Sequence, residues 1–140
     1  MNFSIEKRIP SADEYLALRQ SVGWHAFNVD DCKKGLCNTL FGVCVMRDNT
    51  IIGMGRIVGD GCICFYLQDI VVRPNEQRRG IGKIIMQTLL AYLYENAGIN
   101  AYIGLMASKN AAPFYKKFGF IERPNETMDS GMVLPNFKVQ

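Results

Sequence analysis

The chain of 140 residues is 49% hydrophobic and 21% charged, the balance of an ordinary globular protein, and its length predicts a single domain over residues 1–140. Its net charge of +3 is too small to indicate a nucleic-acid partner. No apolar run approaches the roughly 20 residues of a membrane helix, and the segment behind Met1 lacks a signal-peptide core, so we expect a cytoplasmic protein without a membrane partner.

The first half of the sequence predicts a strand at 3–6, a helix at 11–22, a less regular stretch with room for a second short helix at 23–38, and a hairpin of strands 41–46 and 51–58. The first helix begins at a capping-box pattern, Ser11 with Glu14 three residues later. The hairpin turns at Asp48-Asn49.

The second half predicts a long strand at 63–72, a helix at 80–97, a strand at 100–106, a short helix at 110–118, and closing strands at 120–121 and 132–134. Apolar residues recur at three- and four-residue steps in the long helix, which Gly98 ends. The strand–helix–strand order makes the strand at 100–106 parallel to the one before the helix. We therefore expect an α/β fold with a mixed sheet.

The five cysteines predict neither a disulfide framework nor a metal site. They are Cys32, Cys37, Cys44, Cys62 and Cys64, an odd count without a paired CxxC spacing. Buried, reduced thiols are the expected state. A single histidine leaves too few ligands for zinc, so no metal is expected.

The segment from Ile70 to Lys83 carries the strongest functional signal. A β-branched run stops at Pro74, and Gly80 and Gly82 then open a helix. Glycines allow close approach to the backbone, and the free N–H groups of a helix start bind anions. The segment also holds four basic residues, namely Arg73, Arg78, Arg79 and Lys83. A phosphate or pyrophosphate is the expected ligand; the alternative is a solvated, arginine-rich turn that only caps the helix.

Other phosphate-binding loops fit this segment less well. A Walker A loop needs Ser or Thr where this chain has Ile84, and a dinucleotide fingerprint needs a third glycine at Ile85. The order Val72-x-Pro74, then Gln77-x-x-Gly80-x-Gly82, instead resembles the acetyl-CoA signature of the GCN5-related N-acetyltransferases, the GNAT superfamily.

A second stretch, residues 111–120, resembles the A-x-x-F/L-Y-x-K-x-G-F helix of the same superfamily. The resemblance covers nearly the whole chain. It implies a mixed, mostly antiparallel sheet that is splayed at its centre and flanked by helices. It also implies acetyl-CoA as co-substrate, with no metal.

The resemblance places the pantetheine arm of acetyl-CoA in the splayed sheet, paired with backbone as an added strand. A main-chain N–H there would also stabilise the tetrahedral oxyanion. The cofactor-binding residues that it implies are Ile70, Val71, Val72, Gln77, Arg78, Arg79, Gly80, Ile81, Gly82, Lys83, Asn110, Phe114 and Tyr115. Many relatives have an asparagine where this chain has Ser108, so nearby Asn110 either contacts pantetheine or, as its type favours, caps the short helix.

By resemblance Tyr115 is the general acid that protonates the CoA thiolate; the alternative is a buried tyrosine that only finds a hydrogen bond. The base is less clear, since Tyr66 stands where histone-acetylating members have their glutamate. Asp69 is the nearest acid, as base or orienting group, or else as a structural acceptor on the other strand face.

The acceptor pocket is expected to include Trp24, Phe27 and Tyr66, since an aromatic face can hold an amine. Aromatic residues are nevertheless more often part of a core, and His25 is more typical of a surface histidine than of a base.

Two functions remain open from the sequence. The first is an acetyl-CoA-dependent N-acetyltransferase that acts by direct transfer on a primary amine of a small molecule, or alternatively of a protein or peptide. The second is a non-catalytic acyl-CoA-binding module. Nucleic-acid binding would rest on the basic cluster alone and lacks a motif. A homodimer stays open.

Overall fold

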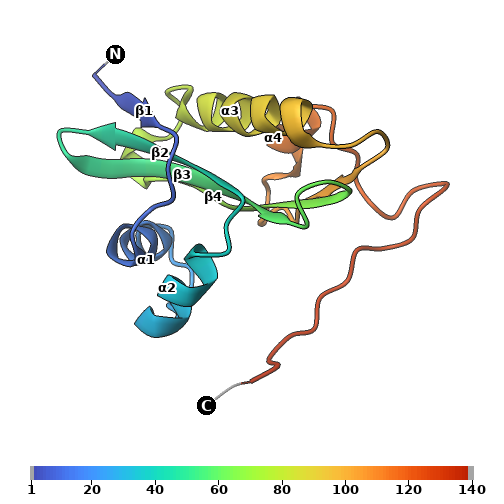
Figure 1. Cartoon of the computed structure of the whole chain (residues 1–140), viewed down its shortest axis with the longest axis horizontal. Coiled ribbons are helices and arrows are strands. Elements are labelled where there is room, and N and C mark those ends of the chain that lie inside the picture. The colour runs from blue at the N-terminus through green and yellow to red at the C-terminus, as the bar shows by residue number, and fades with distance from the viewer. Residues whose placement is uncertain (1, 139–140) are drawn as a thin grey trace. The chain divides into compact units, whose positions relative to one another are not determined.

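The structure is a computed structural model that describes residues 2–138. It contains a five-stranded sheet with the strand order β1-β2-β3-β4-β5 (Figure 1). The strands are β1 Ser4–Glu6, β2 Phe41–Arg47, β3 Thr50–Gly59, β4 Cys64–Val72 and β5 Tyr102–Gly104. The first four are antiparallel to their neighbours, whereas β5 runs parallel to β4. A mixed, mostly antiparallel sheet is thereby confirmed.

Helices cover both faces of this sheet (Figure 1). They are α1 Ala12–Ser21 and α2 Val29–Leu36 on one face and α3 Ile81–Asn96 on the other, with a short 3-10 helix at Pro74–Glu76 before α3. A further short helix, α4 Ala112–Lys116, follows β5 in the sequence. The order of helices and strands through α4 agrees with the sequence prediction.

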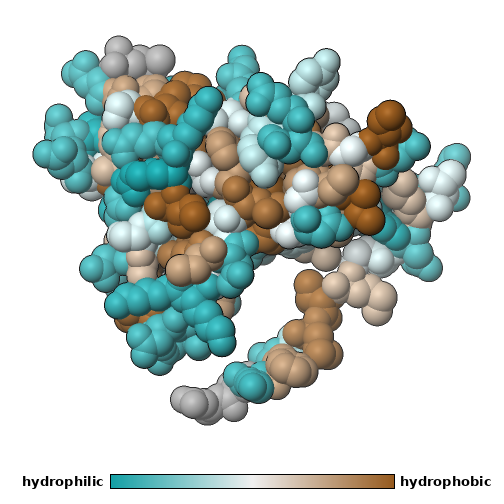
Figure 2. Space-filling model, in the orientation of Figure 1, coloured by the Kyte–Doolittle hydropathy of each residue, from teal (hydrophilic) through white to brown (hydrophobic). Residues whose placement is uncertain are grey.

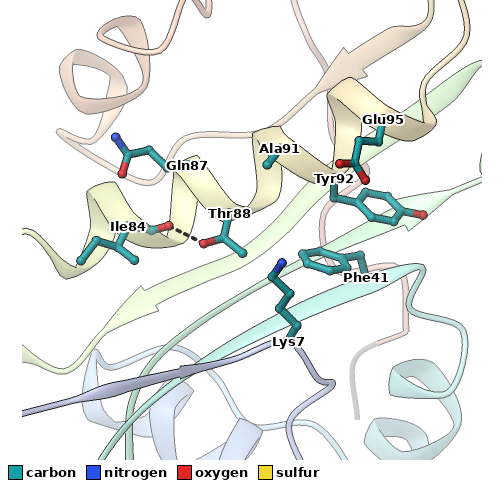
Figure 3. Close-up of a pocket in the computed structure, with 8 residues that line it drawn as sticks. All are labelled: Lys7, Phe41, Ile84, Gln87, Thr88, Ala91, Tyr92 and Glu95. Atoms are coloured by element: carbon teal, nitrogen blue, oxygen red, sulfur yellow. Dashed lines mark hydrogen bonds between the residues drawn. The ribbon is translucent and has the colours of Figure 1, made fainter.

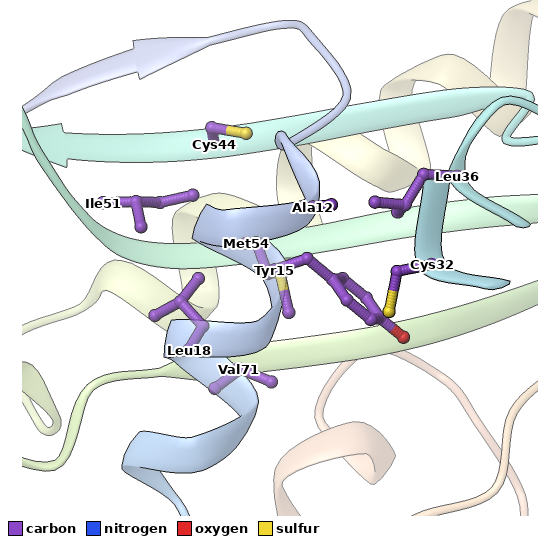
Figure 4. Packing of buried hydrophobic residues seen from close by; sticks show 9 residues of the cluster. All are labelled: Ala12, Tyr15, Leu18, Cys32, Leu36, Cys44, Ile51, Met54 and Val71. Atoms are coloured by element: carbon purple, nitrogen blue, oxygen red, sulfur yellow. The ribbon is translucent and has the colours of Figure 1, made fainter. Parts of the chain in front are cut away.

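The capping box predicted for α1 is present. Ser11 accepts a hydrogen bond from the Glu14 N–H, and the Glu14 carboxylate accepts one from the Ser11 N–H. The buried face of α1 packs on the sheet and on α2 in the cluster that Figure 4 shows. The cluster consists of Ala12, Tyr15, Leu18, Cys32, Leu36, Cys44, Ile51, Met54 and Val71.

Glycines in β3 let α3 pack close to the sheet. A Cβ at Gly55 would lie 2.8 Å from Cγ2 of Ile85 and 3.1 Å from Cδ1 of Leu89, both on α3. The hairpin between β2 and β3 has the predicted turn, because Asp48 and Asn49 have positive φ angles of 48° and 62°.

Contacts divide the chain into two units, Met1–Leu105 and Met106–Gln140. The described part of the second unit, residues 106–138, contains no strand. The predicted closing strands at 120–121 and 132–134 are therefore wrong. Ile121, Met132, Val133 and Leu134 are exposed, and Figure 2 shows hydrophobic residues along the C-terminal segment. A strand is stabilised by packing one face of its side chains, and these exposed residues have no buried face.

The expectation of five buried thiols holds for only two of them. All five cysteines are free, but only Cys32 and Cys44 are buried. Cys62 lies in the turn before β4 and Cys64 is the first residue of that strand; the backbone N–H groups of both donate to the Asp60 carboxylate, and both side chains are exposed. No described helix is long and apolar enough to cross a membrane, and the cytoplasmic location and single domain stay predictions.

Candidate active site

An open edge on β4 is the first element of the site. The strand has nine residues, but β5 pairs only with its first three, Cys64, Phe65 and Tyr66. From Leu67 onward no strand within residues 2–138 pairs with β4 on this side. Such an edge can accept an extended ligand as an additional strand.

Val72 directs its backbone N–H and C=O groups toward this open edge. The N–H of the next residue, Arg73, donates to the Ile52 carbonyl of β3 at 2.9 Å, and successive backbone groups of a strand point to opposite sides. The Val72 carbonyl accepts a hydrogen bond from Nε2 of Gln77 at 3.0 Å. Gln77 therefore lies beside the open edge, ahead of the loop that leads into α3.

The start of α3 presents backbone N–H groups without partners in the helix. Gly80 is the N-cap, with φ 82° and no side-chain cap. The Ile84 N–H donates to the Gly80 carbonyl, so the N–H groups of residues 81–83 precede the helical bonding pattern. Residues 77–80 are exposed. This geometry suits an anion such as phosphate.

The basic residues of the loop differ in their partners. Glu76 is buried and accepts hydrogen bonds from Nε and Nη2 of Arg47 at 3.1 and 2.9 Å, and Arg79 lies 3.6 Å from it. The side chains of Arg78 and Lys83 form no hydrogen bond or ion pair with the residues that the structure describes, and both residues are exposed. Glu76 thus fixes the loop, while two positive charges remain for a ligand.

Asp69 lies at a β-bulge in β4. The β3–β4 register shifts between Met54 and Arg56, so that Asp69 and Ile70 together face Gly55. Asp69 has a φ of 57°, in the left-handed region that non-glycine residues rarely adopt. Its side chain is 1% exposed, although a carboxylate is rarely buried unless it is paired.

Three side chains bind the Asp69 carboxylate. Nη1 of Arg19 lies 2.8 Å from Oδ1, while Nε of Arg56 and Oη of Tyr15 lie 2.9 and 2.8 Å from Oδ2. Burial, together with the Asp69 charge, raises the pKa of Tyr15 to about 12, so the phenol stays a donor. Both carboxylate oxygens are occupied, which favours the structural acceptor over the free base among the two roles expected of Asp69.

The partners of Asp69 were missing from the sequence prediction. One signal was present: Arg19 stands four residues after Tyr15, on the apolar face of the predicted helix. A guanidinium at such a position needs a buried anion to pair with.

Two of the predicted acceptor residues surround Arg19. Its guanidinium carbon lies 5.2 Å from the ring centre of Trp24 and 4.6 Å from that of Phe27. Trp24 also packs against the α1 cluster, whereas Phe27 is 44% exposed. His25 is exposed and meets Phe27 edge-on. Tyr66 lies in the part of β4 that pairs with both neighbouring strands.

The second signature lies in the C-terminal unit. The Tyr115 ring meets Phe114 and Phe120 at steep angles, and burial raises the pKa of its phenol. The predicted helix-cap role of Asn110 is wrong, because the N-cap of α4 is Ala111 and no side chain caps the helix. Asn110 has a φ of 68°, and capping side chains come from residues with extended backbone.

A pocket of about 320 Å³ lies between α3 and the β1–β2 side of the sheet, where the Phe41 and Tyr92 rings stack 4.6 Å apart (Figure 3). None of the predicted site residues lines it. Its lining residues are Lys7, Phe41, Ile84, Gln87, Thr88, Ala91, Tyr92 and Glu95. The open β4 edge is on the opposite side of β3, so this pocket is separate from the candidate site.

Comparison with known proteins agrees with this geometry. The family model for the acetyltransferase (GNAT) domain matches residues 20–140. The chain therefore belongs to the GNAT acetyltransferase family, which uses acetyl-CoA. An uncharacterized N-acetyltransferase, ycf52, from Pyropia yezoensis is 30% identical over 112 residues, which are 77% of this chain and 63% of that protein. The chain thus spans about three fifths of the length of such curated relatives.

Solved structures share the fold. The crystal structure of a protein of unknown function and probable acetyltransferase from meticillin-resistant Staphylococcus aureus has a TM-score of 0.86 and 33% identity, covering 94% of this chain and 98% of that one. A "predicted acetyltransferase with acetyl-CoA" from Clostridium acetobutylicum has a TM-score of 0.73 at 18% identity, covering 96% of each chain. The second likeness concerns the fold alone.

Proposed function

We propose that this protein is an N-acetyltransferase that moves the acetyl group of acetyl-CoA directly to a primary amine of a small molecule. The observation that carries the proposal is the open backbone edge of β4 together with the start of α3, which has no side-chain cap. Gln77 connects the two, because it bonds the Val72 carbonyl at the edge and precedes the helix in the chain. An extended amide-bearing arm and a pyrophosphate fit these two features in sequence.

In the proposed complex, the amides of the pantetheine arm pair with the backbone of residues 70–72. The pyrophosphate lies against the N–H groups of residues 81–83, with Gln77, Gly80 and Gly82 leaving room for it. Arg78 and Lys83 are exposed and supply positive charge, and Arg79 lies close enough to contribute while it also neighbours Glu76. The β4–α3 segment thereby binds the pantetheine arm and the pyrophosphate of the cofactor.

The proposed reaction needs no covalent enzyme intermediate. The amine nitrogen attacks the thioester carbonyl carbon, a C–N bond forms, and the C–S bond breaks to release the CoA thiolate. Tyr115 gives its phenolic proton to that thiolate, and the proton that the nitrogen loses as the amide forms returns to the Tyr115 phenolate through water. Phe114 and Asn110 are further cofactor contacts. Burial raises the pKa of this phenol above its ordinary value, and the phenol carries the proton to be donated throughout the neutral range.

The amine must lose a proton before it attacks. An alkylamine with a pKa near 10.4 is neutral in roughly one molecule per few thousand at pH 7, a cost of about 4–5 kcal/mol if only that form binds. Asp69 is fully engaged by Tyr15, Arg19 and Arg56, so we propose water as the proton acceptor and an orienting role for Asp69.

The acceptor amine is proposed to bind near Trp24, Phe27 and Tyr66. Arg19 already lies over one face of the Trp24 and Phe27 rings. The exposed Phe27 therefore leaves its other face for the substrate, where a cation–π contact would favour an amine over a neutral molecule.

A panel of small amines, polyamines and peptides, assayed for CoA release and for the acetylated product, tests the proposal. Turnover of small primary amines well above the rate without enzyme is the expected result. Acetyl-CoA binding without any turnover would instead indicate the non-catalytic acyl-CoA-binding module. Turnover of peptides alone would move the acceptor to a protein or peptide amine.

A further inference from the structure

Four side chains, three buried and one partly buried, form one connected unit at the β4 bulge. This Asp69 cluster consists of Tyr15 and Arg19 from α1, Arg56 from β3 and Asp69 from β4. The Arg19 and Asp69 side chains are 6% and 1% exposed. Tyr15, Arg19 and Arg56 each donate one hydrogen bond to the carboxylate of Asp69, the single β4 residue that has a left-handed backbone.

The bulge at Asp69 and Ile70 lies in the part of β4 that no longer pairs with β5. It comes two residues before Val72, whose backbone groups point to the open edge. A bulge redirects the residues that follow it. An unfavourable φ angle persists only where surrounding contacts determine it. The contacts that do so here are those of the Asp69 carboxylate.

Arg19 is held from the other side as well. Its Nε and Nη2 atoms both donate to the His25 carbonyl at 3.2 Å, and its guanidinium lies against Trp24 and Phe27. One guanidinium therefore joins the irregular segment 24–27 to the bulge. A lysine cannot reproduce this arrangement, because it lacks the planar fork of donors.

We propose that Arg19 is a positioning residue, which acts through Asp69 to set the β4 bulge and thereby the direction of the backbone groups that meet the cofactor. The expected effect on kcat rests on the proposed function. The control of the bulge by Arg19 does not, because it can be measured on the backbone without an activity assay. Arg19 touches neither the cofactor nor the acceptor in this role.

The test compares Arg19→Gln with Arg8→Gln. Arg8 also pairs with α1, through Glu14 at 2.8 Å, but it lies outside the cluster, so its loss affects stability alone. In Arg19→Gln we expect kcat with saturating substrates to fall about tenfold to a hundredfold, since small displacements at a reacting centre have effects of this size. The Kd for acetyl-CoA should rise severalfold as well, because the backbone groups that the bulge orients bind the cofactor, whereas Arg8→Gln should keep both its kcat and its Kd.

Two further variants make the result specific. Arg19→Lys should fold and show an intermediate kcat, and it replaces Arg19→Gln if that variant does not fold. The double variant Arg19→Gln/Asp69→Asn should lose no more activity than the worse single variant, because both changes act on the same bulge. Losses that multiply would contradict the proposal.

The amide resonances of Ile70 and Val72 provide the readout without activity. They should shift in Arg19→Gln and remain unchanged in Arg8→Gln. If they do not shift and kcat stays within about twofold, Arg19 is only a stabilising residue and the inference is overturned. If the wild-type protein has no acetyltransferase activity but the Ile70 amide resonance still shifts in Arg19→Gln, the proposed function is refuted. The control of the bulge by Arg19 is then still supported.

Discussion

Tyr115 combines an aromatic body with one exchangeable proton. Its ring contacts Phe114 and Phe120 within the C-terminal unit, and burial raises the pKa of its phenol. The same ring contacts would exist if it were only a packing residue. The hydroxyl group therefore decides between the two roles.

Tyr115→Phe removes that hydroxyl and keeps the ring. We expect kcat to fall by roughly 10²–10³, the range usual for general acid–base catalysis, while the melting temperature and the Kd for acetyl-CoA change little. The fall should appear in kcat more than in KM, because proton donation develops in the transition state. Steady-state kinetics with the best amine of the panel give the measurement.

Tyr94→Phe is the matched control, since Tyr94 is 92% exposed on α3 and has no proposed role. It should behave as the wild type. Turnover of Tyr115→Phe within about twofold of the wild type would assign proton transfer to water and leave Tyr115 as a packing residue.

At the scale of an element, the start of α3 lacks two groups that usually stabilise the first turn of a helix. Its N-cap is a glycine without a side-chain cap, and its first turn has no acidic residue. Natural helices usually stabilise the N–H groups of the first turn with a capping side chain or an acid. We propose that the phosphate groups of the cofactor take that place.

Gly82→Asp puts a side chain and a negative charge into this first turn. Acetyl-CoA affinity, measured by calorimetry, should weaken more than tenfold, or about 1.4 kcal/mol, since the carboxylate repels the phosphates and occupies their space. The isolated helix gains from an acid in its first turn, so the variant should remain folded.

Gly35→Asp provides the comparison, because Gly35 is an exposed glycine of α2 with open space around it. It makes the same change in charge far from the loop in the sequence and should bind acetyl-CoA normally. Equal affinities for the Gly82 and Gly35 variants would exclude the loop from the cofactor site.

For the molecule as a whole, the arrangement of thiols argues for direct transfer. Burial raises the pKa of Cys44 to about 12 and that of Cys32 above its ordinary value, so neither is a thiolate at neutral pH. Cys37, Cys62 and Cys64 are exposed, but no described histidine or carboxylate side chain is hydrogen-bonded to them as a base.

Incubation with acetyl-CoA alone should therefore leave the intact mass of the protein unchanged. Electrospray mass spectrometry after one and many turnover times is the measurement, with peptide mapping of the five cysteines. A stoichiometric acetyl adduct that disappears when an amine is added would show ping-pong transfer. A slow adduct on Cys62 or Cys64 that no amine discharges would be simple surface acetylation.

Local patterns in the sequence were sufficient for most of the fold. The capping box at Ser11, the turn at Asp48-Asn49 and the glycines before α3 each specify a conformation through their own side chains or backbone freedom, so no distant contact was needed to read them. The same holds for the two family signatures, because each is a continuous stretch.

Features that depend on distant partners could not be read in this way. Asp69 acquires its partners from residues 50 and 54 positions earlier and from β3, and the bulge that they hold depends on the register of two strands. The apolar residues 132–134 favour a strand, yet a strand forms only where an edge accepts it. Sequence alone thus determined the family and the order of the elements through α4, whereas burial and long-range pairing decided which residues bind Asp69 and where the sheet ends.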